Sequence, residues 1–271
     1  MPNRWSQNHC PWNQKIDRAT QLAGERPAAG EVLGFYTRIL EFQRGLYEQL
    51  DAGGSHAPIV AVSLPQALNF DQAAGQVSEL IAFVSAHGPN QLASESARLQ
   101  GLLTETALQN AIQWLRGVAG PQHAAIFLSR VLLEPQAEHL AATWEPAQQT
   151  AAGNRCPICE SLPQMAVIRQ EGDGGKRLLL CSLCHQPWEF RRVLCPSCGE
   201  ENHERLPRYT AEGFSGVRVE ACDTCHCYLK SVDLTVDGLA VPLVDEIATA
   251  PLDLWAVERG YRKILPNLMG F

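Results

Sequence analysis

The pattern of apolar and polar positions divides the chain into a helical part and a later part made of short strands. Before residue 145, apolar residues recur every three or four positions, which is the spacing of one buried helix face. His87, Gly88 and Pro89 end one such stretch, and Leu102 is assigned to a buried face. The spacing predicts helices over 32–50, 77–84, 91–118, 124–133 and 137–144. Five or six helices with short connections predict an antiparallel bundle.

Short apolar runs separated by Gly, Pro and Cys follow, and they predict small strands and turns. The runs are Ala166–Arg169, Arg177–Leu180 and Val217–Val219. Helical spacing returns from Val244 to Arg259 and ends at Gly260, a residue typical of helix C-termini. We expect this last helix to pack against one of the two parts.

A polar segment rich in small residues, Glu145–Asn154, has the composition of an exposed linker and sets a boundary near residue 150. A chain of 271 residues has room for two domains. We therefore predict an α+β chain with four parts. They are a helical domain over 1–150, two small cysteine-rich β subdomains over 151–192 and 193–243, and a C-terminal helix and tail over 244–271.

Composition and charge restrict the possible functions. Hydrophobic residues make up 45% of the chain and charged residues 19%, as in globular proteins. A net charge of −7 argues against nucleic acid and anionic membranes as partners. No stretch reaches the 18 or so apolar residues needed to span a bilayer, and Met1–Cys10 lacks the apolar core of a secretory signal. We expect a cytoplasmic protein.

The ten cysteines carry the strongest chemical signal, because thiols in a reducing cytosol are typically metal ligands or redox groups. Cys10 stands alone. Eight others form Cys-x-x-Cys pairs with intervals of 21, 10 and 23 residues between successive pairs, which indicates a duplicated unit, and the third pair (CPSC) nearly repeats the first (CPIC). The pairs are Cys156/Cys159, Cys181/Cys184, Cys195/Cys198 and Cys222/Cys225.

Two such pairs complete a tetrahedral set of four thiolates. The duplication favours sequential grouping, with one metal held by the first two pairs and one by the last two. An interleaved arrangement, which joins the first pair with the third, remains an alternative. A thioredoxin-type redox pair would need a βαβ unit, and none is visible. Tetrahedral sulfur suits both zinc and iron, so the spacing leaves the metal open.

Several other residues are candidates for chemistry, and each has a simpler interpretation. His185 and His226 flank pairs that already have four thiolates, so we expect exposed turn residues. Cys227 could capture a metal transiently or become oxidised. Surface or capping positions are expected for His56, His87, His123 and His139.

Charged residues near the strands and in the last helix also have simple interpretations. Arg191 and Arg192, beside Trp188 and Phe190, predict a solvated strand edge, with a contact patch as the alternative. We expect the charges of the last helix, Asp253, Glu258 and Arg259, to face solvent. No nucleophile-and-base constellation stands out in the sequence, which favours a protein without enzymatic activity.

The ordered motifs of the second half resemble the FdhE family of formate dehydrogenase accessory proteins. They are CPIC, CSLC followed by Trp188, the Arg191–Arg192 doublet, CPSC, EACDTC followed by YLK, and APLDLWAVERGY with a closing PN. The resemblance covers about Cys156 to Phe271, whereas the helical part matches in length and character.

The resemblance implies a cytoplasmic assembly factor without enzymatic activity, needed for maturation of respiratory formate dehydrogenase, whose catalytic subunit it binds before export. It also implies two rubredoxin-like subdomains in which the eight paired cysteines bind two iron ions, with zinc as the alternative. Cys227 does not match a family cysteine. Two competing hypotheses are a rubredoxin-like electron carrier acting on a client enzyme and a zinc-ribbon nucleic-acid binder, which the charge disfavours.

Overall fold

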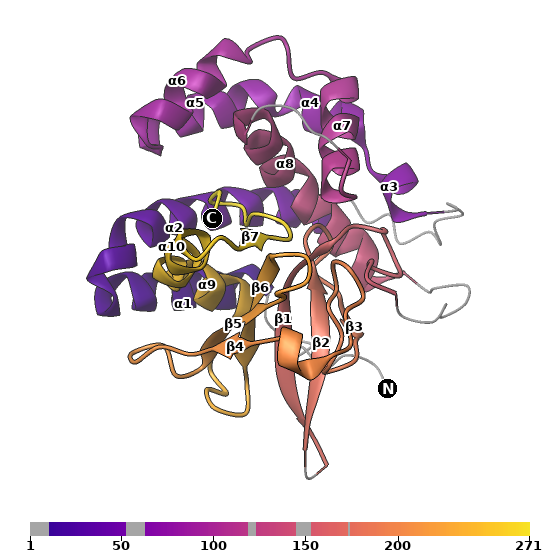
Figure 1. Cartoon of the computed structure of the whole chain (residues 1–271). Helices are drawn as coiled ribbons and strands as arrows, with labels where there is room; N and C mark the ends of the chain where they lie inside the picture. The colour runs from indigo at the N-terminus through magenta and orange to yellow at the C-terminus, as the bar shows by residue number, and fades with distance from the viewer. Residues whose placement is uncertain (1–10, 53–62, 119–122, 145–152, 173) are drawn as a thin grey trace.

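The computed structural model of the chain describes residues 11–52, 63–118, 123–144, 153–172 and 174–271. Helices come first along the chain, a single β-sheet follows, and two helices near the end return to the helical side (Figure 1). Most of the predicted linker, the segment Met1–Cys10 and His56 lie outside the described residues.

The helices of the first part pack around one long central helix. That helix, α8, contacts each of the elements from α2 to α7, and apolar residues occur nearly all round it. A helix that is apolar on every side belongs inside a domain rather than on its surface. The bounds are α1 Pro11–Glu25, α2 Pro27–Ala52, α3 Leu64–Ala67, α4 Phe70–Gly75, α5 Val77–His87, α6 Asn90–Arg98, α7 Glu105–Leu115 and α8 His123–Ala142.

Two of the predicted helix boundaries are wrong. The helix expected over 91–118 is two helices, α6 and α7, because Gly101 adopts a φ of 75° between them and turns the chain. Leu102, assigned to the buried face, is exposed in that turn. The helices expected over 124–133 and 137–144 are one helix, which continues through Pro135. The pattern also gave no prediction for α1.

The strands of the described residues form one sheet, with the order β3-β2-β1-β6-β5-β4 and with β7 added beside β6. The predicted runs lie in β1, β2 and β5, so these three strand predictions are confirmed. The bounds are β1 Pro163–Glu171, β2 Gly174–Cys181, β3 Pro187–Glu189, β4 Arg208–Tyr209, β5 Val217–Ala221, β6 Cys227–Asp233 and β7 Arg262–Lys263.

The sheet contains the duplication seen in the cysteine spacing. In each half a Cys-x-x-Cys pair leads to two antiparallel strands, a second pair and a third strand, which pairs antiparallel with the second strand. The halves are β1–β2–β3 and β4–β5–β6. Parallel pairing of β1 with β6, from Ala166 opposite Ser231 to Ile168 opposite Asp233, joins them into one sheet. The two subdomains therefore share backbone hydrogen bonds, and their sequence boundaries remain a prediction.

Both faces of the central strands are covered, so that neighbouring residues of one strand belong to different cores. Ala166 and Leu229 pack into the core shared with the helices. Met165, Val167 and Tyr228 face the other way, into a smaller core. This explains why successive residues of β1 and β6 are buried, without strict alternation between buried and exposed positions.

The last helix is also two helices, α9 (Pro242–Ala248) and α10 (Ala250–Glu258), separated at Thr249. Pro251 lies in the first turn of the second helix, where proline is tolerated, whereas it would break a continuous helix. The helix ends before Gly260, whose φ of 82° confirms the predicted C-terminus. Helix α9 contacts α1, α2 and β6, so this segment packs against both parts of the chain.

An ion pair fixes α9 to the first helix. The guanidinium of Arg18 donates two hydrogen bonds to the carboxylate of Asp245, at 2.6 and 3.0 Å, and a third to Asp237 at 2.8 Å. Within the described residues, no helix combines the length and the apolarity required to cross a membrane.

Candidate metal centre

The four Cys-x-x-Cys pairs adopt one local structure. In each, the backbone N–H of the first cysteine donates to the carbonyl five residues later, at distances of 2.9 to 3.1 Å. The first cysteines are Cys156, Cys181, Cys195 and Cys222, and we refer to these turns as knuckles one to four. Each knuckle bends the chain so that its two sulfurs point to the same side.

The residue after each pair has a left-handed backbone. Its φ is 62° at Glu160, 53° at His185, 79° at Gly199 and 54° at His226. Among the described residues, no other non-glycine residue has a positive φ. Side chains in this region cost roughly 1–2 kcal/mol per residue, so the surrounding structure must hold them there. The same conformation at four equivalent positions shows that the knuckles are repeats of one another.

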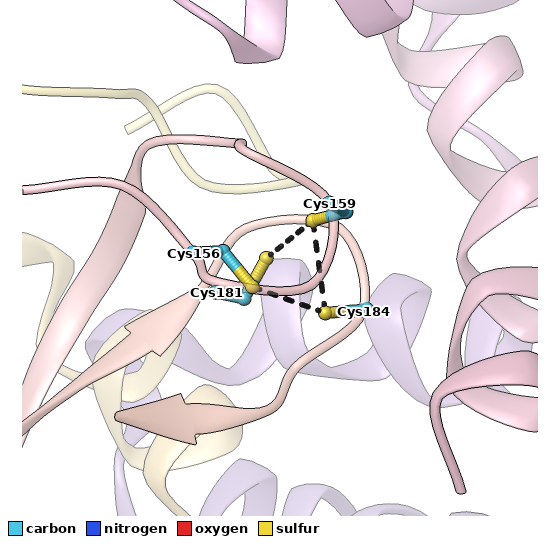
Figure 2. Close-up of side chains that lie close together, drawn as sticks. All are labelled: Cys156, Cys159, Cys181 and Cys184. Atoms are coloured by element: carbon cyan, nitrogen blue, oxygen red, sulfur yellow. Dashed lines mark hydrogen bonds between the residues drawn. The ribbon is translucent and has the colours of Figure 1, made fainter. Parts of the chain in front are cut away.

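Knuckles one and two bring four sulfurs together at the junction of the sheet and the helices. Cys156 and Cys159 precede β1, Cys181 ends β2, and Cys184 follows it. Figure 2 shows the sulfurs turned toward a common centre from two loops. The separations are 3.6 Å for Cys156–Cys184, 3.2 Å for Cys159–Cys181 and 3.7 Å for Cys159–Cys184. All four residues are buried.

Knuckles three and four form a second group. Along the chain, knuckle three lies between β3 and β4, and knuckle four lies between β5 and β6. The sulfurs of Cys195 and Cys225 are 3.8 Å apart, and those of Cys198 and Cys222 are 3.7 Å apart. In this group Cys198 is exposed and Cys225 is partly exposed. In both groups all four sulfurs lie within 4.8 Å of one another, so the sulfurs are grouped sequentially rather than interleaved.

The geometry fits a tetrahedral metal ion. With metal–sulfur bonds of about 2.3 Å, the edge of a sulfur tetrahedron is about 3.8 Å. The separations given above, 3.2 to 3.8 Å, lie at or below that edge, the other pairs lie within 4.8 Å, and the shortest is far above the length of a disulfide, about 2.05 Å. The two clusters could therefore each hold one metal ion. Four thiolates suit zinc or iron, so the donor set leaves the metal open.

Ionisation of the first group requires a positive ion at its centre. Burial raises the pKa of Cys181 and of Cys184 well above the ordinary value for a thiol. Hydrogen bonds lower the pKa of Cys159, with the largest contribution from Cys156 and the next from Cys181. Four buried like charges cannot persist so close together without a cation, so binding of a dication and deprotonation of the group occur together.

The second group is more polar. Burial raises the pKa of Cys195 to about 11, although hydrogen bonds from the N–H groups of Cys198 and Ser197 act in the opposite direction. Burial also opposes ionisation of Cys222, but the N–H groups of Cys225 and Thr224, with the thiols of Cys198 and Cys225, outweigh it and lower the pKa of this thiol. Backbone donors of this kind stabilise thiolates, as a metal site requires.

The other candidates from the sequence lie outside these groups. Cys227 is buried, belongs to neither sulfur cluster, and accepts a hydrogen bond from Arg262 at 3.7 Å. His226 is an exposed turn residue, as expected. His185 is not, because its Nδ1 pairs with the buried carboxylate of Glu138, which Lys15 also contacts at 2.5 Å. His87 and His123 lie at the surface and His139 is partly buried.

Comparisons with known proteins agree with this geometry. Models of the FdhE central domain and the FdhE C-terminal domain match residues 155–192 and 191–269. The crystal structure of the FdhE protein from Pseudomonas aeruginosa superposes with a TM-score of 0.75 and 26% sequence identity over 95% of each chain. The chain belongs to the FdhE family.

Relatives in the family extend the similarity along the chain. The protein FdhE homolog of Aquifex aeolicus is 27% identical over 270 residues, which is 94% of each chain. A protein FdhE homolog of Pseudomonas aeruginosa is 36% identical over 126 residues, 45% of this chain and 41% of the relative. The FdhE central-domain model spans the four cysteines of the first group, and the C-terminal model spans those of the second.

A buried cluster of charges lies within the FdhE C-terminal match and was not anticipated. Lys230 of β6 is fully buried between Glu246 of α9 and Asp253 of α10, and Lys263 of β7 contacts both carboxylates. The interpretation of Asp253 as a solvent-facing charge is therefore wrong, although Glu258 and Arg259 are exposed as expected. The hydroxyl of Tyr228 also donates to Asp253, at 2.9 Å. The available signal in the sequence was a lysine directly after the apolar run Cys227–Leu229.

Proposed function

We propose that the chain is a cytoplasmic assembly factor for formate dehydrogenase, which binds the catalytic subunit of that enzyme and carries two metal ions in its cysteine clusters. Membership of the FdhE family supports the assembly role. The cysteine motifs and the APLDLWAVERGY segment carry the resemblance to formate dehydrogenase accessory proteins. The observation that carries the metal part is the convergence of eight sulfurs in two tetrahedral groups.

The eight paired cysteines are the proposed ligands, four for each ion. The thiolates bind the metal, backbone N–H groups such as those of Leu183 and Ser197 donate to the sulfurs at 3.4 Å, and the left-handed residues orient each knuckle. We assign iron to the two clusters because the family resembles paired rubredoxins, and zinc is the alternative metal. Either ion would tie together the two ends of one antiparallel strand pair, β1 with β2 in the first cluster and β4 with β5 in the second.

A role without enzymatic chemistry agrees with the polar groups at the site. The described surroundings of both clusters consist of cysteine ligands, turn residues and ion pairs such as Arg116 with Glu160 at 2.9 Å. We therefore propose that the chain contributes binding and delivery rather than catalysis.

Co-purification and deletion test the assembly role. A tagged chain should retain the formate dehydrogenase catalytic subunit, and deletion of its gene should abolish formate dehydrogenase activity while the amount of subunit persists. Cys198→Ser and Glu258→Gln form a matched pair for complementation, since one removes a proposed ligand and the other an exposed charge. Normal activity in the deletion strain together with absence of the subunit from the tagged preparation would refute the proposal.

Electron transfer is the second candidate, and the exposed Cys198 favours it, because a sulfur ligand at the surface shortens the path to a client protein. This function needs iron that cycles reversibly between its ferrous and ferric forms. A preparation that contains zinc alone, and still restores formate dehydrogenase activity, would exclude it.

A further inference from the structure

The two sulfur clusters have the same ligands but different surroundings. All four cysteines of the first cluster are buried, whereas the second contains the exposed Cys198 and the partly exposed Cys225. Exposure of a ligand sulfur controls how easily water or a competing ligand reaches the ion. The difference therefore concerns the rate of metal exchange rather than the affinity alone.

Packing around the first cluster ties it to the folded core. Its four cysteines belong to the same apolar cluster as the central helix residues Leu128 and Leu132. The guanidinium of Arg116, just after α7, donates to the carbonyl of Cys159 at 3.2 and 3.3 Å. Opening this site requires separation of the sheet from the helices.

The second cluster lacks such a cover. None of its cysteines belongs to either apolar core cluster of the described residues. Its two knuckles are tied instead by a side-chain contact at the surface, in which the hydroxyl of Thr224 donates to Glu200 at 2.5 Å. The other oxygen of Glu200 accepts from the backbone N–H groups of Glu201 and Asn202, at 3.0 and 2.8 Å. We call the Thr224–Glu200 contact the clasp.

We infer that the two sites have different roles: the first keeps its metal for as long as the chain is folded, and the second exchanges its metal with the surroundings under control of the clasp. The inference rests on the proposed binding of two metals and adds which of them is exchangeable. Exchange at the second site needs only local opening of the clasp and of knuckles three and four, whereas exchange at the first needs opening of the core.

Chelator competition on the full chain tests this division. The protein is loaded anaerobically with zinc, its stoichiometry is measured by native mass spectrometry, and excess EDTA is then added. Zinc should leave in two phases, each of one ion per chain, and the second phase should be at least about tenfold slower than the first. The helical circular dichroism signal should persist through the first phase. Cys198→Ser should remove the fast phase and leave one slowly released zinc.

Alkylation of the wild-type protein assigns the phases without any variant that fails to fold. During the fast phase, iodoacetamide should modify Cys198 and Cys225, while the cysteines of the first cluster react only in the slow phase. Loss of the clasp in Thr224→Val or Glu200→Ala should accelerate the fast phase on the order of fivefold, which is the effect of one hydrogen bond. Glu204→Ala removes an exposed carboxylate four residues along, outside the clasp; it is the control and should leave both phases unchanged.

Three results would overturn the inference: release of both ions in a single phase, earlier alkylation of the first cluster, or equal rates in Thr224→Val and wild type. Failure of the proposed metal binding gives a different result, because a chain that takes up no zinc is recognised from its stoichiometry before EDTA is added.

Discussion

The guanidinium of Arg130 donates a hydrogen bond to the backbone carbonyl of Ser182 over 3.2 Å. Arg130 lies in the central helix, and Ser182 directly follows the ligand candidate Cys181 in knuckle two. The same guanidinium pairs with Glu134 at 2.8 Å and donates to the carbonyl of Pro266 at 3.2 Å. One buried side chain thus joins the helices, the first sulfur cluster and the C-terminal segment.

Replacement of Arg130 should strongly destabilise the protein. In Arg130→Met, the carboxylate of Glu134 and two backbone carbonyls would be left buried without this partner, at a cost of about 3–5 kcal/mol in unfolding free energy. Urea denaturation followed by circular dichroism measures this. Arg44→Met, which breaks an exposed pair with Glu48, should cost less than about 1 kcal/mol. Equal losses in the two variants would contradict the role assigned to Arg130.

Acid should weaken the fold through the buried charges. Burial opposes ionisation of Glu246, but Lys230 and Lys263 outweigh it and lower the pKa of this carboxyl to about 2. In the unfolded chain the group takes up a proton near pH 4.3, roughly its ordinary pKa. The stabilisation is therefore complete above that pH and is lost as the pH falls toward 2.

The variant Glu246→Gln isolates this effect. It should be less stable than wild type at pH 7, by on the order of 3 kcal/mol, and the difference should shrink as the pH approaches 3. Urea denaturation at pH 7, 4 and 3 measures the difference, and metal content is recorded at each pH because acid also removes thiolate-bound metal. The exposed Glu258→Gln serves as control. A difference that does not change with pH would contradict the prediction.

Cys227 should be dispensable for metal binding. Its sulfur lies outside both clusters and accepts a hydrogen bond from Arg262. The variant Cys227→Ser should therefore keep two metal ions per chain, and its unfolding free energy should change by about 1 kcal/mol. Cys225→Ser, two residues earlier, should keep one. Native mass spectrometry counts the ions, and loss of a metal from Cys227→Ser would identify a fifth ligand.

The left-handed residues predict opposite effects of two substitutions in the second cluster. Gly199→Val places a β-branched side chain at a φ of 79° and should weaken zinc binding there by about 1–2 kcal/mol. His226→Gly removes the same strain at knuckle four and should leave binding unchanged or slightly tighter. Competition with a zinc indicator measures both affinities, and a stronger loss in His226→Gly would show that its side chain contributes to the site.

The sequence was most informative where chemistry fixed the spacing. Cys156 and Cys222 could be assigned to knuckles because a Cys-x-x-Cys turn is a local structure, and the duplicated intervals predicted sequential grouping. The strand runs in β1, β2 and β5 were also local signals. By contrast, the pairing of β1 with β6 that unites the halves depends on contacts between residues far apart in the chain.

Other features were hidden for the same reason. Asp253 has the spacing of an exposed helix position, and only the approach of Lys230 from a distant strand buries it. The break at Gly101 lies within a stretch whose apolar spacing continues on both sides. Exposure of Cys198, which distinguishes the two clusters, depends on which elements cover each one and has no counterpart in the motif itself.

Native mass spectrometry of the chain purified anaerobically, with metal analysis of the same sample, tests the central claim most directly. Two ions per chain, with one lost in Cys198→Ser, is the predicted result. A wild-type chain that carries no metal, or whose eight paired cysteines are joined in disulfides, would contradict it.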